Sequence, residues 1–258
     1  MSESPLTGYR VLVTRPAHQA DELVEAIDRA GGQAVRFPVI QIIGRRPEVV
    51  AREFASLPRP DIAIFVSRNA VLHGLAAIRN SGASIAAVGP STKAAIESAG
   101  VEVAISVDGG FDSEHLLTHA AFDDVAGKAV TIVRGESGRE LLSDTLTSRG
   151  AKVSYLSAYR REMRRASPGE VEALDKRWCG GGIDCVTAMS VETLKNLLCQ
   201  LPPSSLEQLR QTPLVAPGAR VIQTAMELVP GISGVMASGP RTADMLNALI
   251  EARHSGRN

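Results

Sequence analysis

One stretch of this chain occurs twice, and this repetition constrains the fold more than any other feature. The segment 127–159 aligns without a gap with the segment 8–40, at an offset of 119 residues. The coincident pairs include a charged one: Gly8/Gly127, Val11/Val130, Val13/Ile132, Arg15/Arg134, Leu23/Leu142 and Gly31/Gly150. Generic patterning could produce a shared strand–helix skeleton, but the matching arginine favours internal duplication. Internal repeats decide architecture, so this interpretation comes first.

Each copy has the pattern of a strand, a loop, a helix and a second extended segment. In the second copy an apolar run from Val130 to Val133 stops at Arg134-Gly135, and leucines at helical spacing then lead to Gly150. Weaker matches continue along the chain: Asp61/Asp184, Ser67/Ser190, Val88/Val215, Pro90/Pro217 and Leu117/Leu246. Each half therefore contains four strand–helix units, a pattern typical of parallel α/β sheets.

Further elements are expected between the repeats. We predict strands at 10–13, 61–66, 85–88, 101–107, 184–188, 213–216 and 235–238, and helices after each of them. Ser113 is the expected cap of a helix over 114–121. The extended segment 34–43 contains Pro38, which restricts it to a sheet edge or an inter-domain ribbon.

Composition sets the class of protein. A length of 258 residues suggests two domains. Lys plus Arg equals Asp plus Glu at 28 each, so no global field draws the chain to nucleic acid or a membrane. Aromatic residues make up 3%, too few for a base-stacking platform. Three cysteines without a CxxC pair, no leader pattern and no long apolar run predict a cytoplasmic protein with free thiols.

Common catalytic fingerprints are missing from the sequence. It has no G-x-G-x-x-G, Walker loop, G-x-S-x-G or H-E-x-x-H motif. His115 and His119 are spaced i, i+4, but two ligands without a third make a weak metal site, and we interpret them as surface residues.

Small and hydroxyl residues follow the predicted strands, at the starts of the next helices. Open α/β sheets bind ligands at this edge, and free N–H groups at helix N-termini favour anions. The candidate substrate-binding residues are Arg15, Ser67, Asn69, Gly89, Ser91, Thr92, Arg134, Gly135, Glu136, Ser190, Pro217 and Gly218. Two alternatives stay open: helix capping for Ser67 and Ser190, and scaffold ion pairs for Arg15 and Arg134.

Several segments in order resemble a known family. VLVTRP, DIAIFVSRNAV, AVGPSTKAAIESAGV, VRGESGRELLSDTLTSRGAKV and the tyrosine of SAYRR together resemble uroporphyrinogen-III synthases, from about Arg10 to Ala248. The resemblance implies two flavodoxin-like, doubly wound α/β domains. Residues 1–36 plus 165–258 would form one domain and 44–156 the other. Residues 37–43 and 157–164 would form a two-stranded linker ribbon.

The resemblance also implies a reaction. Family members close hydroxymethylbilane, a linear tetrapyrrole with eight carboxylates, into uroporphyrinogen III with loss of water and inversion of ring D. Loss of the hydroxyl leaves an azafulvene, ring D attacks it to give a spiro intermediate, and fragmentation and reclosure follow. Without enzyme the chain closes to the type I isomer, so orientation is the main task. The resemblance further implies that the reaction needs neither a metal nor an organic cofactor.

Particular residues match family positions. Tyr159 matches a tyrosine placed near the departing hydroxyl, to which a phenol can donate. Its alternative is a ribbon tyrosine that packs on a domain edge, and Tyr155 is expected to be structural. Thr92 matches a threonine of the binding cleft. One turn departs from the family. Many members carry threonines after the last Gly-Pro turn, whereas this chain has Ala216-Pro217-Gly218-Ala219, so only the backbone N–H groups of this turn can bind the substrate.

The expected partner is the small-molecule substrate, with a transient contact to hydroxymethylbilane synthase, no nucleic acid and no membrane, in a monomer. The hypothesis from a different class is a non-catalytic two-lobed module that binds polycarboxylate anions in the same cleft. Sequence separates the two only through Tyr159.

Overall fold

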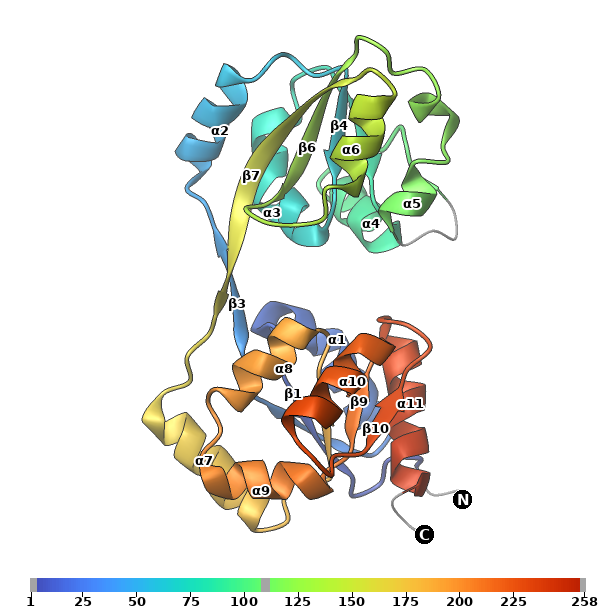
Figure 1. The fold of residues 1–258 in the computed structure, drawn as a ribbon. Helices are drawn as coiled ribbons and strands as arrows, with labels where there is room; N and C mark the ends of the chain where they lie inside the picture. The colour runs from blue at the N-terminus through green and yellow to red at the C-terminus, as the bar shows by residue number, and fades with distance from the viewer. Residues whose placement is uncertain (1–3, 108–111, 256–258) are drawn as a thin grey trace. The chain divides into compact units, whose positions relative to one another are not determined.

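The computed structural model describes residues 4–107 and 112–255, and the chain divides into two compact units (Figure 1). Unit 1 comprises Met1–Gln41 and Glu162–Asn258, and unit 2 is the continuous segment Ile42–Arg161. The chain passes between them twice, each time inside a strand: β3 (Ile40–Gly44) and β7 (Lys152–Met163). These strands are neighbours in one sheet.

Unit 1 contains a five-stranded parallel sheet in the order β10-β9-β8-β1-β2. Numbered as the strands appear in this unit, the order is 2-1-3-4-5 from the other edge, as in flavodoxin-like folds. Its elements are β1 (Arg10–Val13), α1 (Ala17–Arg29), β2 (Gln33–Arg36), α7 (Pro168–Cys179), β8 (Cys185–Thr187), α8 (Val191–Leu198), α9 (Pro203–Gln211), β9 (Leu214–Ala216), α10 (Ala219–Leu228), β10 (Gly234–Met236) and α11 (Thr242–Ser255).

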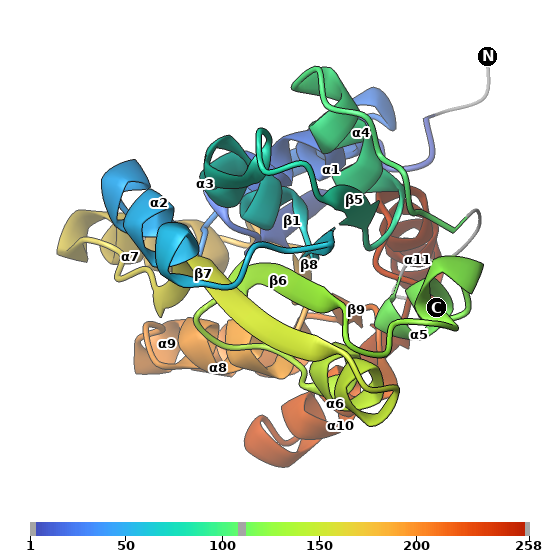
Figure 2. The same cartoon turned by 90° about the horizontal axis from the view of Figure 1, so that it is seen from above.

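Helices cover both faces of this sheet. Val11 and Val13 of β1 pack with Leu23 of α1 and Leu249 of α11 in one buried cluster. Leu12 lies between them and is also fully buried, because successive side chains of a strand point to opposite faces. Figure 2 shows α1 and α11 on one side of the unit 1 strands and α8 and α10 on the other. Strands buried on both faces explain the unbroken apolar runs of the sequence.

Unit 2 contains a sheet in the order β3-β7-β6-β4-β5. The pairs β7–β6, β6–β4 and β4–β5 are parallel. Its other elements are α2 (Pro47–Ser56), β4 (Ile62–Phe65), α3 (Arg68–Ile78), β5 (Ser84–Ala87), α4 (Pro90–Ser98), α5 (Ser113–Leu116), a 3₁₀ turn (Ala120–Phe122), β6 (Ala129–Gly135) and α6 (Leu141–Ser148).

The two faces of this sheet carry separate cores. Phe65 of β4 packs in a cluster with Leu75 of α3. Ile64, the preceding residue, packs in the other cluster with Leu142 and Leu146 of α6. In Figure 2, α3 and α4 lie on one side of β6 and α6 lies on the other. Parallel strands and helices on both faces therefore agree with the α/β class predicted from the sequence.

Two local expectations were wrong, and one helix was not predicted. Residues 101–107 form no strand. Within this segment only Ile105 pairs with the sheet, through a single parallel β-bridge to Ala86 of β5. Ser113 is not a cap, because the carboxylate of Asp112 accepts from the backbone N–H of His115 at 2.9 Å and the helix ends at Leu116. Helix α9 was not predicted from the sequence; it begins at Pro203, and Pro is compatible with the first turn of a helix.

Gly74 offers a test of how tightly α3 packs on the sheet. A Cβ at this position would lie 2.5 Å from Cγ1 of Val133, on β6. Alanine in a helix is favoured over glycine by about 1 kcal/mol, whereas overpacking a core costs about 1–3 kcal/mol. We therefore expect Gly74→Ala to lower the free energy of unfolding by about 1 kcal/mol in urea titrations.

The matched control is Gly169→Ala in α7. A Cβ there meets nothing within 4 Å, so this variant should be at least as stable as the unsubstituted chain. A Gly74→Ala protein as stable as Gly169→Ala would contradict the close approach of α3 to β6.

Candidate functional site

The predicted residues fall at the carboxyl ends of parallel strands in both units. In unit 2 they follow four neighbouring strands, and because those strands run in the same direction their ends meet at one edge. This edge brings together Ser67 and Asn69 after β4, Gly89, Ser91 and Thr92 after β5, Arg134, Gly135 and Glu136 at the end of β6, and Tyr159 on β7. Arg15, Ser190, Pro217 and Gly218 lie at the corresponding edge of the unit 1 sheet.

A β-bulge sets the position of Tyr159. Arg134 of β6 is paired with Ser157 of β7, but the next residue, Gly135, is paired with Tyr159, so that Ala158 is skipped. A bulge of this kind turns the following side chain to the other face of a strand. As a result Ala158 and Tyr159, which are adjacent in the chain, pack in the same core cluster. Tyr159 is 3% exposed.

The tyrosine side chain is enclosed by groups from three elements. Its hydroxyl lies 3.1 Å from Oγ of Ser67. The ring lies over Gly135, where a Cβ would approach ring atom Cε2 to 3.0 Å. The centroid of the His73 ring on α3 is 6.2 Å from that of Tyr159. Glycine at 135 thus makes room for the ring, and the hydroxyl is held at the start of α3.

Ser67 also has the capping role that the sequence left open. Its Oγ accepts a hydrogen bond from the backbone N–H of Ala70 at 3.2 Å, which caps α3. After the neighbouring strand β5, Gly89 is the N-terminal cap of α4, and its φ of 85° is a conformation that favours glycine. Thr92 and Asn69 are buried in the first turns of α4 and α3, whereas Ser91 is exposed. Both turns place helix N-termini at this edge.

Arg134 takes part in an ion pair, the alternative considered from the sequence. Its two terminal nitrogens each donate to Oε1 of Glu140 at 3.0 Å, and its guanidinium carbon lies 4.4 Å above the centroid of the Tyr155 ring. Tyr155 also donates its hydroxyl hydrogen to Glu140. The hydrogen bond from Tyr155 and then that from Arg134 lower the pKa of Glu140 from its ordinary value. Sequence reasoning missed Glu140.

Glu136 follows on the same turn. Its side chain is exposed, and its backbone N–H donates to the carbonyl oxygen of Tyr159 at 2.9 Å. This contact fixes the turn to the strand just beyond the bulge.

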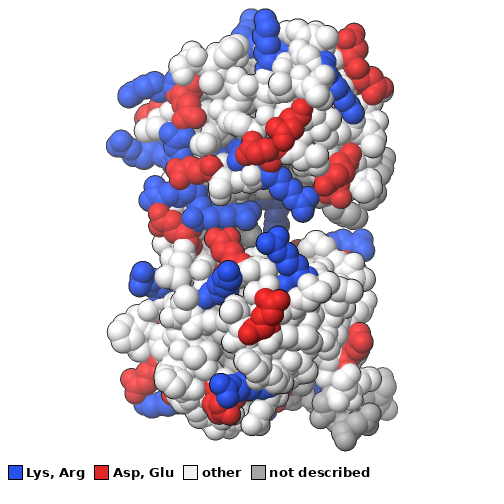
Figure 3. Space-filling view, viewed as in Figure 1, with Lys and Arg blue, Asp and Glu red and all other residues white. Residues whose placement is uncertain are grey.

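The unit 1 edge repeats parts of this arrangement. Oγ of Ser190 accepts from the backbone N–H of Thr193 at 3.1 Å, which caps α8 as Ser67 caps α3. Gly218, after Pro217, is the N-terminal cap of α10. The guanidinium of Arg15 donates to the carbonyl oxygen of Pro240 at 3.1 Å. On the face that Figure 3 draws, acidic and basic side chains are interspersed.

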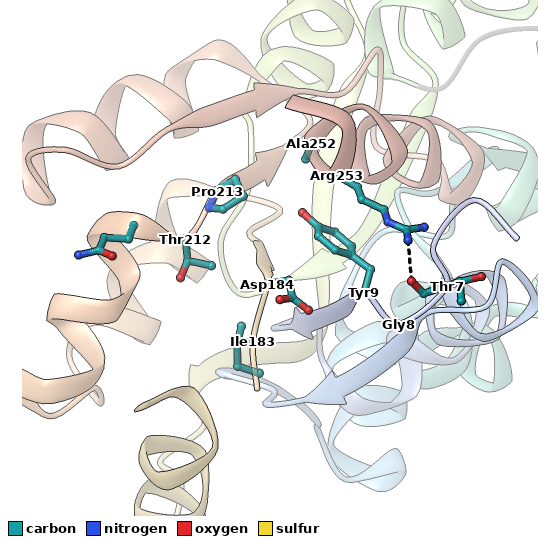
Figure 4. A pocket seen from close by; sticks show the side chains of 10 residues that line it. Thr7, Gly8, Tyr9, Ile183, Asp184, Thr212, Pro213, Ala252 and Arg253 are labelled. Carbon is teal, nitrogen blue, oxygen red and sulfur yellow. Dashed lines mark hydrogen bonds between the residues drawn. The ribbon is translucent and has the colours of Figure 1, made fainter. Parts of the chain in front are cut away.

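A cavity of about 380 Å³ lies at the opposite, amino-terminal edge of the unit 1 sheet (Figure 4). Tyr9 and Asp184 line it, and buried Arg253 donates to the carbonyl oxygens of Pro5 and Thr7 at 2.6 and 2.7 Å. Burial and then the neighbouring Cys185 raise the pKa of Tyr9. No sequence signal predicted this cavity, because its residues come from four separated loops and helix ends.

Two features are absent from the described part of the chain. No group of three or more His, Cys, Asp or Glu residues suited to a metal ion occurs among them, and His115 and His119 lie on different helical turns. Within the same residues, no helix combines the length and the apolar character that crossing a bilayer requires. Fold and site together define a doubly wound α/β protein with hydroxyl groups and helix N-termini at the carboxyl edge of its sheets, where open α/β sheets generally bind ligands.

Comparison with known proteins identifies the family. The model of the family described as uroporphyrinogen-III synthase HemD matches residues 21–247. The chain belongs to the uroporphyrinogen-III synthase family.

Individual relatives agree with this assignment. The chain is 32% identical to uroporphyrinogen-III synthase of Salmonella typhimurium over 200 residues, which cover 74% of this chain and 80% of the relative. The corresponding protein of Escherichia coli is 30% identical over 199 residues, with the same coverage. The solved uroporphyrinogen-III synthetase of Helicobacter pylori is 16% identical, with a TM-score of 0.61 over 96% of this chain and 99% of that one, and shares the fold.

The Glu140 contact predicts a pH dependence. Because the pKa of Glu140 is lowered in the folded protein, its contribution to stability is fully present above its ordinary value of 4.5 and is lost as the pH falls through the folded value. We expect Tyr155→Phe to raise this pKa toward 4.5 in an NMR titration of the side-chain carboxyl. Tyr9→Phe, in the other unit, is the control and should leave the titration unchanged. An unaltered Glu140 titration in Tyr155→Phe would contradict the contact.

Proposed function

We propose that this chain converts hydroxymethylbilane into uroporphyrinogen III. Membership of the uroporphyrinogen-III synthase family carries this proposal, and it favours an enzyme over the non-catalytic anion-binding module. The reaction removes water and inverts ring D by way of a spiro intermediate. The expected enzyme class is a cyclising lyase.

The site residues are proposed to act in two ways. The helix N-termini after β4 and β5, with Ser67 and Thr92, would bind substrate carboxylates through N–H and hydroxyl donors. Ser190 and Gly218 would do the same at the unit 1 edge. Arg134 would hold the turn before α6 through Glu140, because its guanidinium is already engaged.

Tyr159 is the proposed catalytic group. The hydroxyl that leaves the substrate must gain a proton, and a phenol can donate one. Support comes from the bulge at Gly135 and the hydroxyl of Ser67, which hold the Tyr159 hydroxyl in one place at the carboxyl edge. A held donor suits a reaction in which orientation decides which isomer forms.

We also propose that the two units arose by duplication. The equivalent glycines Gly31 and Gly150 have nearly the same φ, 83° and 86°. The equivalent aspartates Asp184 and Asp61 accept from a backbone N–H of the neighbouring strand, at 2.7 and 2.8 Å. The order β5-β4-β6-β7 in unit 2 corresponds to β9-β8-β1-β2 in unit 1, with Ile105 in the place of β10.

We also propose the domain boundaries that the sequence predicted. One domain comprises 1–36 plus 165–258, the other comprises 44–156, and 37–43 and 157–164 form the ribbon between them. Support comes from β3 and β7, in which both passages between the units lie. A cytoplasmic monomer that takes its unstable substrate in a transient contact with hydroxymethylbilane synthase is proposed with it.

The proposed function has a direct test. The purified protein is incubated with freshly made hydroxymethylbilane, and the products are oxidised and separated into type I and type III isomers. We expect type III to predominate. Type I alone, as in the reaction without protein, would contradict the proposed function.

Tyr159→Phe tests the catalytic group in the same assay. Loss of one hydroxyl should lower the rate of type III formation by about tenfold or more, with the circular dichroism spectrum unchanged. Tyr9→Phe, which removes a phenol hydroxyl in unit 1 away from the carboxyl edge, is the control and should retain the full rate. Equal rates for both variants would remove Tyr159 from the mechanism.

A further inference from the structure

Burial of Tyr159 raises a question about how its hydroxyl reaches a ligand. The residue is 3% exposed, and its ring is enclosed by Gly135 and α3. Ser67, whose Oγ lies 3.1 Å from the phenol oxygen, is only half-buried. Of the two hydroxyl groups, the serine is therefore the one nearer to the solvent side of the edge.

The hydrogen bonds of Ser67 define a direction for proton transfer. A serine hydroxyl has one hydrogen and two lone pairs. One lone pair accepts from the backbone N–H of Ala70 at 3.2 Å. When the second lone pair accepts a hydrogen bond from the Tyr159 hydroxyl, the hydrogen of the serine hydroxyl remains available to donate toward a ligand. Each hydrogen bond accepted by an oxygen strengthens its own O–H as a donor, so the first turn of α3 and Tyr159 both make Ser67 a better donor.

We infer that Ser67 and Tyr159 form a two-hydroxyl relay. In this relay Ser67 donates a proton to the departing hydroxyl of the substrate, and Tyr159 donates the proton that replaces it on Ser67. This inference rests on the proposed function and assigns a catalytic role to Ser67 in addition to binding. It goes beyond helix capping, because capping alone needs no partner at the serine hydrogen.

The steps of the relay balance. Ser67 gives its proton to the departing hydroxyl, the carbon–oxygen bond breaks with its electron pair on oxygen, and water leaves. In the same step Ser67 takes the phenol proton of Tyr159, which becomes a phenolate. Closure of the macrocycle releases one proton from the ring carbon that forms the last bond, and this proton returns to Tyr159.

The relay predicts an order of severity. Ser67→Ala removes the group that meets the substrate, whereas Tyr159→Phe leaves Ser67 able to donate alone. We expect Ser67→Ala to lower the single-turnover rate of type III formation by about 100-fold and Tyr159→Phe by about tenfold. The double variant should be no slower than Ser67→Ala. If Ser67 only oriented Tyr159, then Tyr159→Phe would be the slower single variant, and that result would overturn the relay.

Two controls separate the hydroxyl from the cap. Ser167→Ala removes an equivalent cap, that of α7. Oγ of Ser167 accepts from the backbone N–H of Glu170 at 3.3 Å, and the variant should stay within about twofold of the unsubstituted rate. Ser67→Thr keeps a hydroxyl and a capping oxygen and should recover most of the rate lost in Ser67→Ala. A threonine variant as slow as the alanine variant, or a comparable loss in Ser167→Ala, would argue against the relay.

A proton inventory gives a readout that a structural role would not change. The single-turnover rate is measured in mixtures of H₂O and D₂O. Two protons moving in one step predict a curved dependence on the deuterium fraction for the unsubstituted protein and a straight line for Tyr159→Phe. If type III still forms and both proteins give a straight line, the relay is overturned and the proposed function stands. Absence of type III from the unsubstituted protein would instead defeat the proposed function.

Discussion

Parallel pairing around β6 is the constraint on which the candidate site depends. This strand pairs with β4 on one side and with β7 on the other, in the same direction. Residues that are 92 positions apart in the chain, Ser67 and Tyr159, are thereby brought within hydrogen-bonding distance. The strands are apolar on both faces because helices cover both. Polar groups concentrate where the strands end and helix N-termini begin.

An irregularity in this sheet, the bulge opposite Arg134 and Gly135, sets the position of Tyr159. Regular alternation would send the side chain after Ala158 to the other face, among the residues packed against α6. The bulge keeps Tyr159 on the α3 face, and the missing side chain at Gly135 leaves space for its ring. Glycine and bulges both weaken a strand. Both features occur together here, beside the buried phenol ring of Tyr159.

Sequence alone predicted what depends on local pattern. Apolar runs such as 61–66 located the central strands, and the duplicated segment indicated a shared unit. The bulge was out of reach, because it depends on the pairing of Arg134 with Ser157 rather than on either residue. The partners of Arg134 were missed since Glu140 lies in a loop without a motif. Residues 101–107 have a strand composition, but only Ile105 is paired with β5.

The division of the chain has a consequence for its synthesis. Unit 2 is one continuous segment and can fold as soon as it leaves the ribosome. In unit 1 the backbone N–H of Arg10 at the start of β1 bonds to Asp184, 174 residues later. The edge of β1 that pairs with β8 therefore stays unpaired until β8 has been made, and its N–H and C=O groups are open to pairing with other chains. An unpaired strand edge of this kind favours aggregation of the nascent chain until β8 has been made.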